Sequence, residues 1–172
     1  MDSAEYERRI AARFANFDQD RNGYIAREDF GTAAKALLAE FGTPARSDKG
    51  QSLYIGAEAL WQGMAGIADV DGDQRVSRDE FVTGAVKRLR DNPERFAEIA
   101  RPFLRGAIAV ADEDGQGATA EAAERALRAL GVAPEAAATA AKALLDGNGR
   151  IATEDRVLAA FAAYFTTPEP EE

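Results

Sequence analysis

The stretch Asp18–Phe30 reads DQDRNGYIAREDF, and the stretch Asp69–Phe81 reads DVDGDQRVSRDEF. Both place acidic or amide side chains at the first, third and fifth residues. Both also have a β-branched residue at the eighth position and a carboxylate at the twelfth, directly before a phenylalanine. An ordinary acidic turn does not need all of these positions in register. The shared spacing therefore predicts two loops, each built around a cation and flanked by two helices.

The first loop has the oxygen ligands that a hard dication requires. A twelve-residue loop supplies them from its first, third and fifth side chains, its seventh carbonyl and a twelfth carboxylate. The expected ligands are the side chains of Asp18, Asp20, Asn22 and Asp29 and the carbonyl of Tyr24. Gly23 allows the turn at the sixth position. We expect Ca²⁺ here, with Mg²⁺ as an alternative because Asp29 is one methylene shorter than the usual glutamate.

The second loop is more acidic than the first. Its expected ligands are the side chains of Asp69, Asp71, Asp73 and Glu80 and the carbonyl of Arg75. Gln74 stands at the sixth position, where a left-handed backbone costs a non-glycine residue about 1 to 2 kcal/mol. Four carboxylates outweigh that strain, so the second loop is also predicted to bind Ca²⁺.

Two weaker copies of the pattern follow. The third loop begins with Asp112, Asp114, Gln116 and Gly117, but its twelfth residue is Ala123 and the next carboxylate, Glu124, comes one residue late. Weak binding by this loop is left open. In the fourth copy Gly149 and Ile151 set the register, and Leu144, Asp146, Asn148 and Asp155 then occupy the ligand positions. A leucine cannot bind a metal, so a metal-free loop is expected, with Ile151 paired to Thr119.

Apolar residues at helical spacing flank all four loops and predict an all-α fold. We expect four helix-loop-helix units in two pairs, 1–90 and 91–165, with short β-bridges between paired loops and a flexible tail, 166–172. Gly42–Ser52 is predicted to be a linker inside the first pair. Asp91-Asn92-Pro93 separates the pairs. Since this break is short, compact packing is expected rather than two separated lobes.

Composition excludes several classes of function. The 172 residues include no Cys and no His, so thiolate nucleophiles, His-based triads and zinc–thiolate sites are excluded. The formal net charge of −9 argues against a nucleic-acid surface. No apolar run approaches the ~20 residues of a membrane span. We expect a monomeric cytoplasmic protein whose partners are calcium ions, and no enzyme, because the clustered carboxylates are explained as ligands.

The sequence resembles the EF-hand proteins of the calerythrin-like and sarcoplasmic calcium-binding type. The resemblance covers nearly the whole chain and rests on FANFDQDRNGYIAREDF, on LWQGMAGIADVDGDQRVSRDEFV with Trp61, and on the linker before Leu53. It implies a compact molecule with four EF-hands and a role as a calcium buffer or transporter rather than an enzyme. The third and fourth loops depart from the full ligand set that the family pattern would contain.

Two binding functions remain in competition. The favoured one is a calcium buffer or signal modulator, whose acidic loops take up the ion and order the surrounding helices. The alternative is a calcium sensor that opens an apolar groove for a target protein. Such grooves are rich in methionine, and this chain has only Met1 and Met64. The composition therefore favours the buffer.

Overall fold

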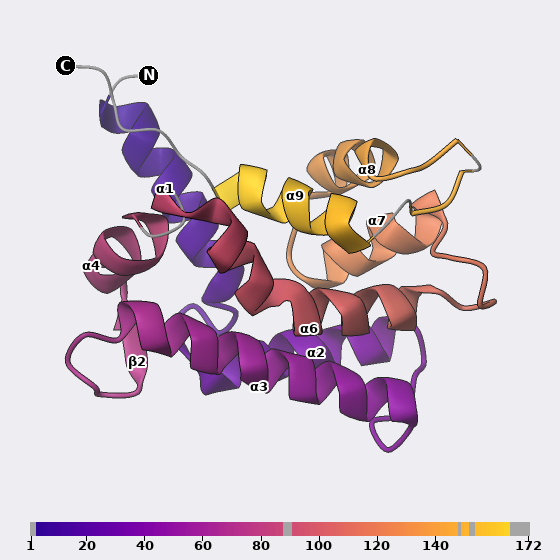
Figure 1. Ribbon diagram of the computed structural model, residues 1–172, viewed down its shortest axis with the longest axis horizontal. Coiled ribbons are helices and arrows are strands. Elements are labelled where there is room, and N and C mark those ends of the chain that lie inside the picture. The colour runs from indigo at the N-terminus through magenta and orange to yellow at the C-terminus, as the bar shows by residue number, and fades with distance from the viewer. Residues whose placement is uncertain (1–2, 88–90, 148, 152–153, 166–172) are drawn as a thin grey trace.

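The computed structural model describes residues 3–87, 91–147, 149–151 and 154–165. Figure 1 shows an arrangement dominated by helices. The helices are α1 (Ser3–Phe17), α2 (Arg27–Glu40), α3 (Asp48–Ala68), α4 (Arg78–Glu80), the π-helix η1 (Phe81–Val86), α6 (Pro93–Ala111), α7 (Ala120–Ala129), α8 (Pro134–Ala143) and α9 (Glu154–Phe165). The strands are β1 (Tyr24–Ala26) and β2 (Arg75–Ser77). The all-α prediction is confirmed; the predicted tail, 166–172, lies outside the described residues.

Side-chain caps fix where two long helices begin. The Ser47 hydroxyl accepts a hydrogen bond from the Gly50 amide, so α3 begins at Asp48. The predicted linker Gly42–Ser52 is therefore wrong in its second half. The Asn92 side chain accepts a hydrogen bond from the Arg95 amide, and Pro93 is the first residue of α6. The helix break expected over Asp91-Asn92-Pro93 is therefore present at Asn92, while Asp91 and Pro93 are helical.

Short β-pairs join the loops two by two. β1 and β2 are antiparallel, and Ile25 lies opposite Val76, which confirms the expected bridge at the eighth position. Both side chains are fully buried. In the C-terminal pair Thr119 lies opposite Arg150, so the predicted pairing of Thr119 with Ile151 is wrong by one residue. The Ile151 amide donates instead to the carbonyl of Ala118, at 2.8 Å.

Aromatic residues beside the first two loops form the centre of the core. The rings of Phe14, Phe17 and Phe30 come from α1 and α2, Phe81 follows the second loop, and Trp61 lies on α3. Neighbouring ring centroids in this group are 5.6 to 6.0 Å apart, which is a favourable separation for edge and tilted contacts. The phenylalanine that directly follows each acidic loop is therefore anchored in the core, and it holds the twelfth position in place.

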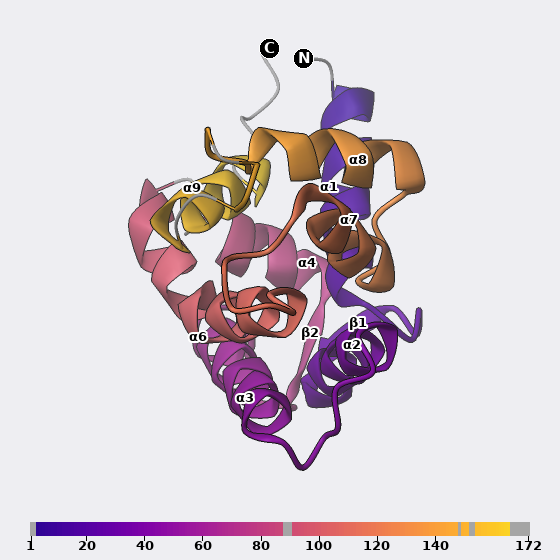
Figure 2. The same cartoon turned by 90° about the vertical axis from the view of Figure 1, so that its right-hand side faces the viewer.

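The two halves of the chain share this core. In both Figures 1 and 2, α6 lies along α3, and α9 lies on the other side of α6 in Figure 1. Ala100, Phe103 and Val110 of α6 belong to the same buried cluster as the aromatic residues. At Gly56 the helices approach so closely that a Cβ would lie 2.5 Å from the carbonyl oxygen of Pro102. The predicted compact packing is confirmed.

Among the described residues no helix combines the length and the apolar character needed to cross a membrane.

Candidate metal centre

The first loop connects α1 to α2 and brings three carboxylates together. Asp18, Asp20 and Asp29 each place an oxygen within 4.8 Å of the others. Backbone amides orient them: Gly23 and Asn22 donate to Asp18 at 2.9 and 3.2 Å, and Asn22 also donates to Asp20 at 3.2 Å. The loop therefore folds around its own acidic side chains, with Gly23 in the left-handed region at φ +87°.

Asp29 closes the first loop from the first turn of α2. Its two oxygens accept hydrogen bonds from the amides of Asp20, at 3.2 Å, and Ala26, at 2.8 Å. The side chain is buried, with 1% of its surface exposed. Burial raises the pKa of Asp29, two backbone hydrogen bonds oppose the change, and the charges of Asp20 and Asp18 raise the pKa further. A bound cation would offset this charge repulsion.

The second loop connects α3 to α4 and gathers four carboxylates. Asp69, Asp71, Asp73 and Glu80 place one oxygen each within 4.8 Å of one another. The two oxygens of Glu80 accept from the amides of Val70, at 2.8 Å, and Ser77, at 3.1 Å. The Ser77 hydroxyl accepts in return from the Glu80 amide. The two residues therefore cap the start of α4 reciprocally, and the closing carboxylate is part of that cap.

The second loop has two features that fit a divalent cation. Oδ1 of Asp69 is buried without a hydrogen-bond partner, although Oδ2 accepts from the Gln74 amide at 3.0 Å. Burial raises the pKa of Asp69. Leaving a buried carboxylate oxygen without a partner costs folding free energy, and such an oxygen is a good ligand for a hard cation. Gln74 has φ +64°, so the expected left-handed backbone is present despite its cost.

The remaining predicted ligands lie at the edges of the two sites. Asn22 is exposed, and its amide oxygen accepts from the Tyr24 amide at 3.0 Å. Tyr24 and Arg75, expected to contribute carbonyls, are the first residues of β1 and β2. The Arg75 guanidinium lies 4.1 Å from the centre of the Tyr24 ring and binds Asp73 at 2.9 Å. The hydrogen bond from Arg75 lowers the pKa of Asp73.

The third loop departs from this geometry where its helix begins. The Thr119 hydroxyl caps α7 by accepting from the Ala122 amide, so the helix begins at the ninth position. α2 and α4 begin at the tenth, which places Asp29 and Glu80 third in their helices. In α7 the third residue is Ala122, and Glu124 lies further along the helix. Oδ1 of Asp112 is buried without a partner, as at Asp69, and the Gln116 amide donates to Asp114 at 3.0 Å.

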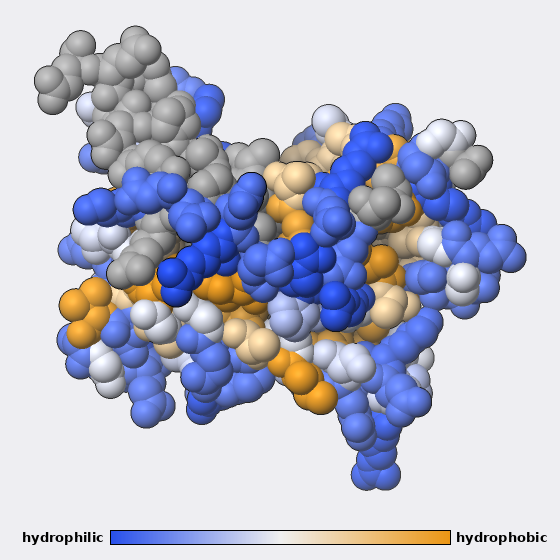
Figure 3. Space-filling model, viewed as in Figure 1, coloured by the Kyte–Doolittle hydropathy of each residue, from blue (hydrophilic) through white to orange (hydrophobic). Residues whose placement is uncertain are grey.

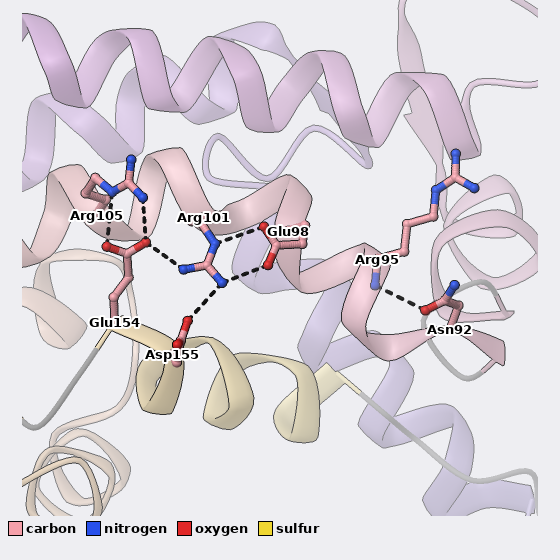
Figure 4. Close-up of polar contacts among 7 residues, drawn as sticks. All are labelled: Asn92, Arg95, Glu98, Arg101, Arg105, Glu154 and Asp155. Carbon is pink, nitrogen blue, oxygen red and sulfur yellow. Dashed lines mark hydrogen bonds and ion pairs between the residues drawn. The ribbon is translucent and has the colours of Figure 1, made fainter.

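The closing carboxylate of the fourth loop forms an ion pair with another helix. Asp155, at the start of α9, binds Arg101 of α6 at 2.9 Å, and its side chain is 81% exposed. Figure 4 shows Arg101 between Glu98, Glu154 and Asp155, while Arg105 binds Glu154. The side chain of Asp146 accepts from the Arg150 amide at 3.2 Å. Leu144 follows the last residue of α8, and Asn148 lies outside the described residues.

The sequence interpretation missed the arginines of the C-terminal pair. Arg101 engages the twelfth-position carboxylate of the fourth loop, and Arg150 engages Asp114 of the third. The position of Arg150 gave no clear signal, because Arg75 occupies the same seventh position in the second loop and pairs there with Asp73 of its own loop. Arg101 gave no signal either, since it is distant in sequence from Asp155.

Comparison with known proteins agrees with this geometry. Residues 7–86 match the family model of the EF-hand domain pair. Calerythrin of Saccharopolyspora erythraea is 26% identical over 162 residues, which cover 92% of each chain. A Streptomyces coelicolor calcium-binding protein, described in connection with prokaryotic calcium-mediated regulation, is 64% identical; the match covers 95% of this chain and 99% of that one, with a TM-score of 0.91.

A more distant solved structure shares the fold. The coelenterazine-binding protein of Renilla muelleri, in its calcium-loaded apo form, is 20% identical with a TM-score of 0.67. The match covers 98% of this chain and 91% of that protein. The four-unit helical arrangement therefore extends well beyond close sequence relatives.

Proposed function

The chain belongs to the prokaryotic calerythrin-like EF-hand proteins, which bind calcium, and on this premise we propose that it is a calcium buffer with two sites, in the first and second loops. The proposed ligands are those expected from the sequence: Asp18, Asp20, Asn22, Tyr24 and Asp29, and Asp69, Asp71, Asp73, Arg75 and Glu80. The grouping of four carboxylates in the second loop is the observation that most directly supports the proposal.

The two loops hold their carboxylates in position through backbone hydrogen bonds. Backbone amides hold Asp18, Asp29, Asp69 and Glu80 in place, so the charged oxygens are gathered in advance. This arrangement concentrates negative charge, which destabilises the calcium-free chain. A calcium ion would neutralise that charge, and its binding free energy would then add to the stability of the folded chain.

Dye binding and scattering distinguish a buffer from a sensor. On adding calcium, a buffer should gain thermal stability while its binding of a hydrophobic dye falls or stays level. Glu80→Gln, which removes one carboxylate from the second loop, should show a smaller calcium-induced gain in thermal stability. A large calcium-induced rise in dye binding, together with expansion in solution scattering, would contradict the buffer.

One observation favours the sensor as a second candidate. An open pocket of about 580 Å³ lies beside the second loop, and its lining combines the apolar residues Ile67, Val70 and Ile99 with polar and charged ones: Thr83, Lys87, Asp91, Asn92 and Arg95. Val70 is 80% exposed, and its amide donates to Glu80, so movement of the closing carboxylate would move this wall. Figure 3 shows small hydrophobic patches between hydrophilic residues on one face of the molecule. The Streptomyces relative's link to regulation also supports this candidate.

Other parts of the assignment stay predictions. We propose no catalytic role, because the clustered carboxylates are assigned to the metal and the Streptomyces relative is a calcium-binding protein. A cytoplasmic location, a monomeric state and the division into pairs at 1–90 and 91–165 also remain predictions. Sedimentation of the purified chain with and without calcium would test the monomer.

A further inference from the structure

The third loop holds a positive charge that comes from the fourth loop. Nη1 of Arg150 lies 2.9 Å from the carbonyl oxygen of Gly117 and 3.4 Å from Oδ1 of Asp114. Nη2 lies 3.2 Å from Oδ2 of Asp114. Asp114 and Gly117 are the third and sixth residues of the third loop. A guanidinium is permanently charged, and its planar set of donors matches a carboxylate.

The backbone fixes Arg150 in this place. In the N-terminal pair the two eighth residues, Ile25 and Val76, lie opposite each other. In the C-terminal pair the eighth residue of the third loop, Thr119, lies opposite Arg150, the seventh of the fourth. A shift of one residue turns a side chain to the other face of a β-pair. The backbone of Asp146 and Arg150 holds the shift, since the Asp146 amide donates to the Arg150 carbonyl at 2.7 Å.

We propose that Arg150 determines how many calcium ions the chain binds. Its guanidinium takes the place of a cation against Asp114, so calcium enters the third loop only when Arg150 is displaced. The loop keeps a second carboxylate for such an ion, because Oδ1 of Asp112 is buried without a hydrogen-bond partner. Arg150 therefore acts as a specificity-determining residue that keeps calcium out of the third loop.

Tethering and charge both favour arginine over calcium in this loop. Arg150 belongs to the same chain, so its effective concentration at Asp114 is high and independent of the calcium supply. The ion would gain few charged ligands, since the twelfth residue is Ala123, which is buried as part of α7. A calcium loop loses affinity as its number of charged ligands falls.

Calorimetric calcium titration of Arg150→Gln in the full chain tests the proposal. We expect the two binding events of the parent chain plus a third, at least about tenfold weaker, because the third loop offers fewer carboxylates. Arg128→Gln, which removes an exposed arginine of α7, is the matched control and should keep two events. A folded Arg150→Gln chain with only two events, or a third event in Arg128→Gln, would overturn the proposal.

The double variant Arg150→Gln/Asp114→Asn tests whether the Asp114 carboxylate is the group that would bind the third calcium ion. It lacks both members of the pair, so the third event should disappear; its persistence would mean that Asp114 is not the carboxylate that Arg150 guards. The Asp114 side chain is 51% exposed, so water can solvate its carboxylate and both variants should fold. Failure of both variants to fold would show that Arg150 serves packing rather than charge. Asp18→Ala and Glu80→Ala report on the first two loops, so failure of this proposal is distinguishable from failure of the proposed function.

Discussion

Asp29 and Glu80 each have two roles, one in the proposed metal site and one at the start of a helix. Asp29 and Glu80 close the proposed metal sites and at the same time accept hydrogen bonds from backbone amides at the start of the exit helix. Their positions are therefore fixed by the helix as well as by the loop. A change at either residue alters the geometry of the site and the helix terminus together.

The length of the closing side chain should set the selectivity of the first loop. Asp29→Glu adds one methylene, which lets both carboxylate oxygens reach a larger ion without contraction of the loop. We expect a higher preference for calcium over magnesium at this site, measured by calcium titration in competing magnesium. Asp79→Glu, an exposed change in α4, is the control. Equal selectivity in the parent chain and in Asp29→Glu would remove this explanation.

Backbone strain at Gln74 should be removable. Gln74 has φ +64° where a glycine would be unstrained, but glycine also gains more freedom on unfolding. We therefore expect Gln74→Gly to stabilise the chain by up to about 1 kcal/mol, the left-handed cost less the entropic one. Thermal unfolding with and without calcium provides the measurement. Arg21→Gly, at φ +56° in the first loop, should behave alike; a loss of stability in both would contradict the argument.

Helices and loops differ in how far the sequence predicts them. Apolar spacing predicted the helices, and ligand spacing predicted a short β-bridge between the first two loops, because both patterns are local. The start of α3 at Asp48 was missed since turn-forming residues hid the cap at Ser47. The shifted pairing of Thr119 with Arg150 was also missed. It depends on contacts between two loops, and the ligand pattern of either loop alone does not encode them.

The close crossing of α3 and α6 should not tolerate a side chain at Gly56. A Cβ there would lie 2.5 Å from the Pro102 carbonyl oxygen and 2.7 Å from the Phe103 Cα, both backbone atoms that cannot move alone. Gly56→Ala should therefore destabilise the chain by about 1 to 3 kcal/mol, although alanine favours helix. Urea unfolding of the calcium-loaded chain measures this.

Gly66 provides the matched control on the same helix. Apart from its chain neighbours and the backbone of its own helix, no atom lies within 4 Å of a Cβ placed at Gly66, so Gly66→Ala should stabilise α3 by up to about 1 kcal/mol through helix propensity alone. If both substitutions stabilise the chain, the close approach of α3 to α6 does not occur in solution.

At the scale of the whole molecule, the two pairs share one architecture, but the negative charge of their loop carboxylates is balanced in different ways. In the N-terminal pair, two groups of acidic side chains lie close together, and one member, Asp73, is paired with Arg75 of its own loop. In the C-terminal pair, Arg150 binds Asp114 of the third loop and Arg101 binds Asp155 of the fourth. The core runs through both pairs, so calcium binding in one is expected to stabilise the entire chain.

Calorimetric counting of calcium ions near neutral pH tests the central claim most directly. The parent chain should bind two ions tightly, and Asp18→Ala and Glu80→Ala should each lose one, because each removes a carboxylate from a different site. Asp155→Ala, which removes the last acidic residue of the fourth loop, should leave both events unchanged. Four equivalent tight sites, or two tight ions in Glu80→Ala, would contradict the account.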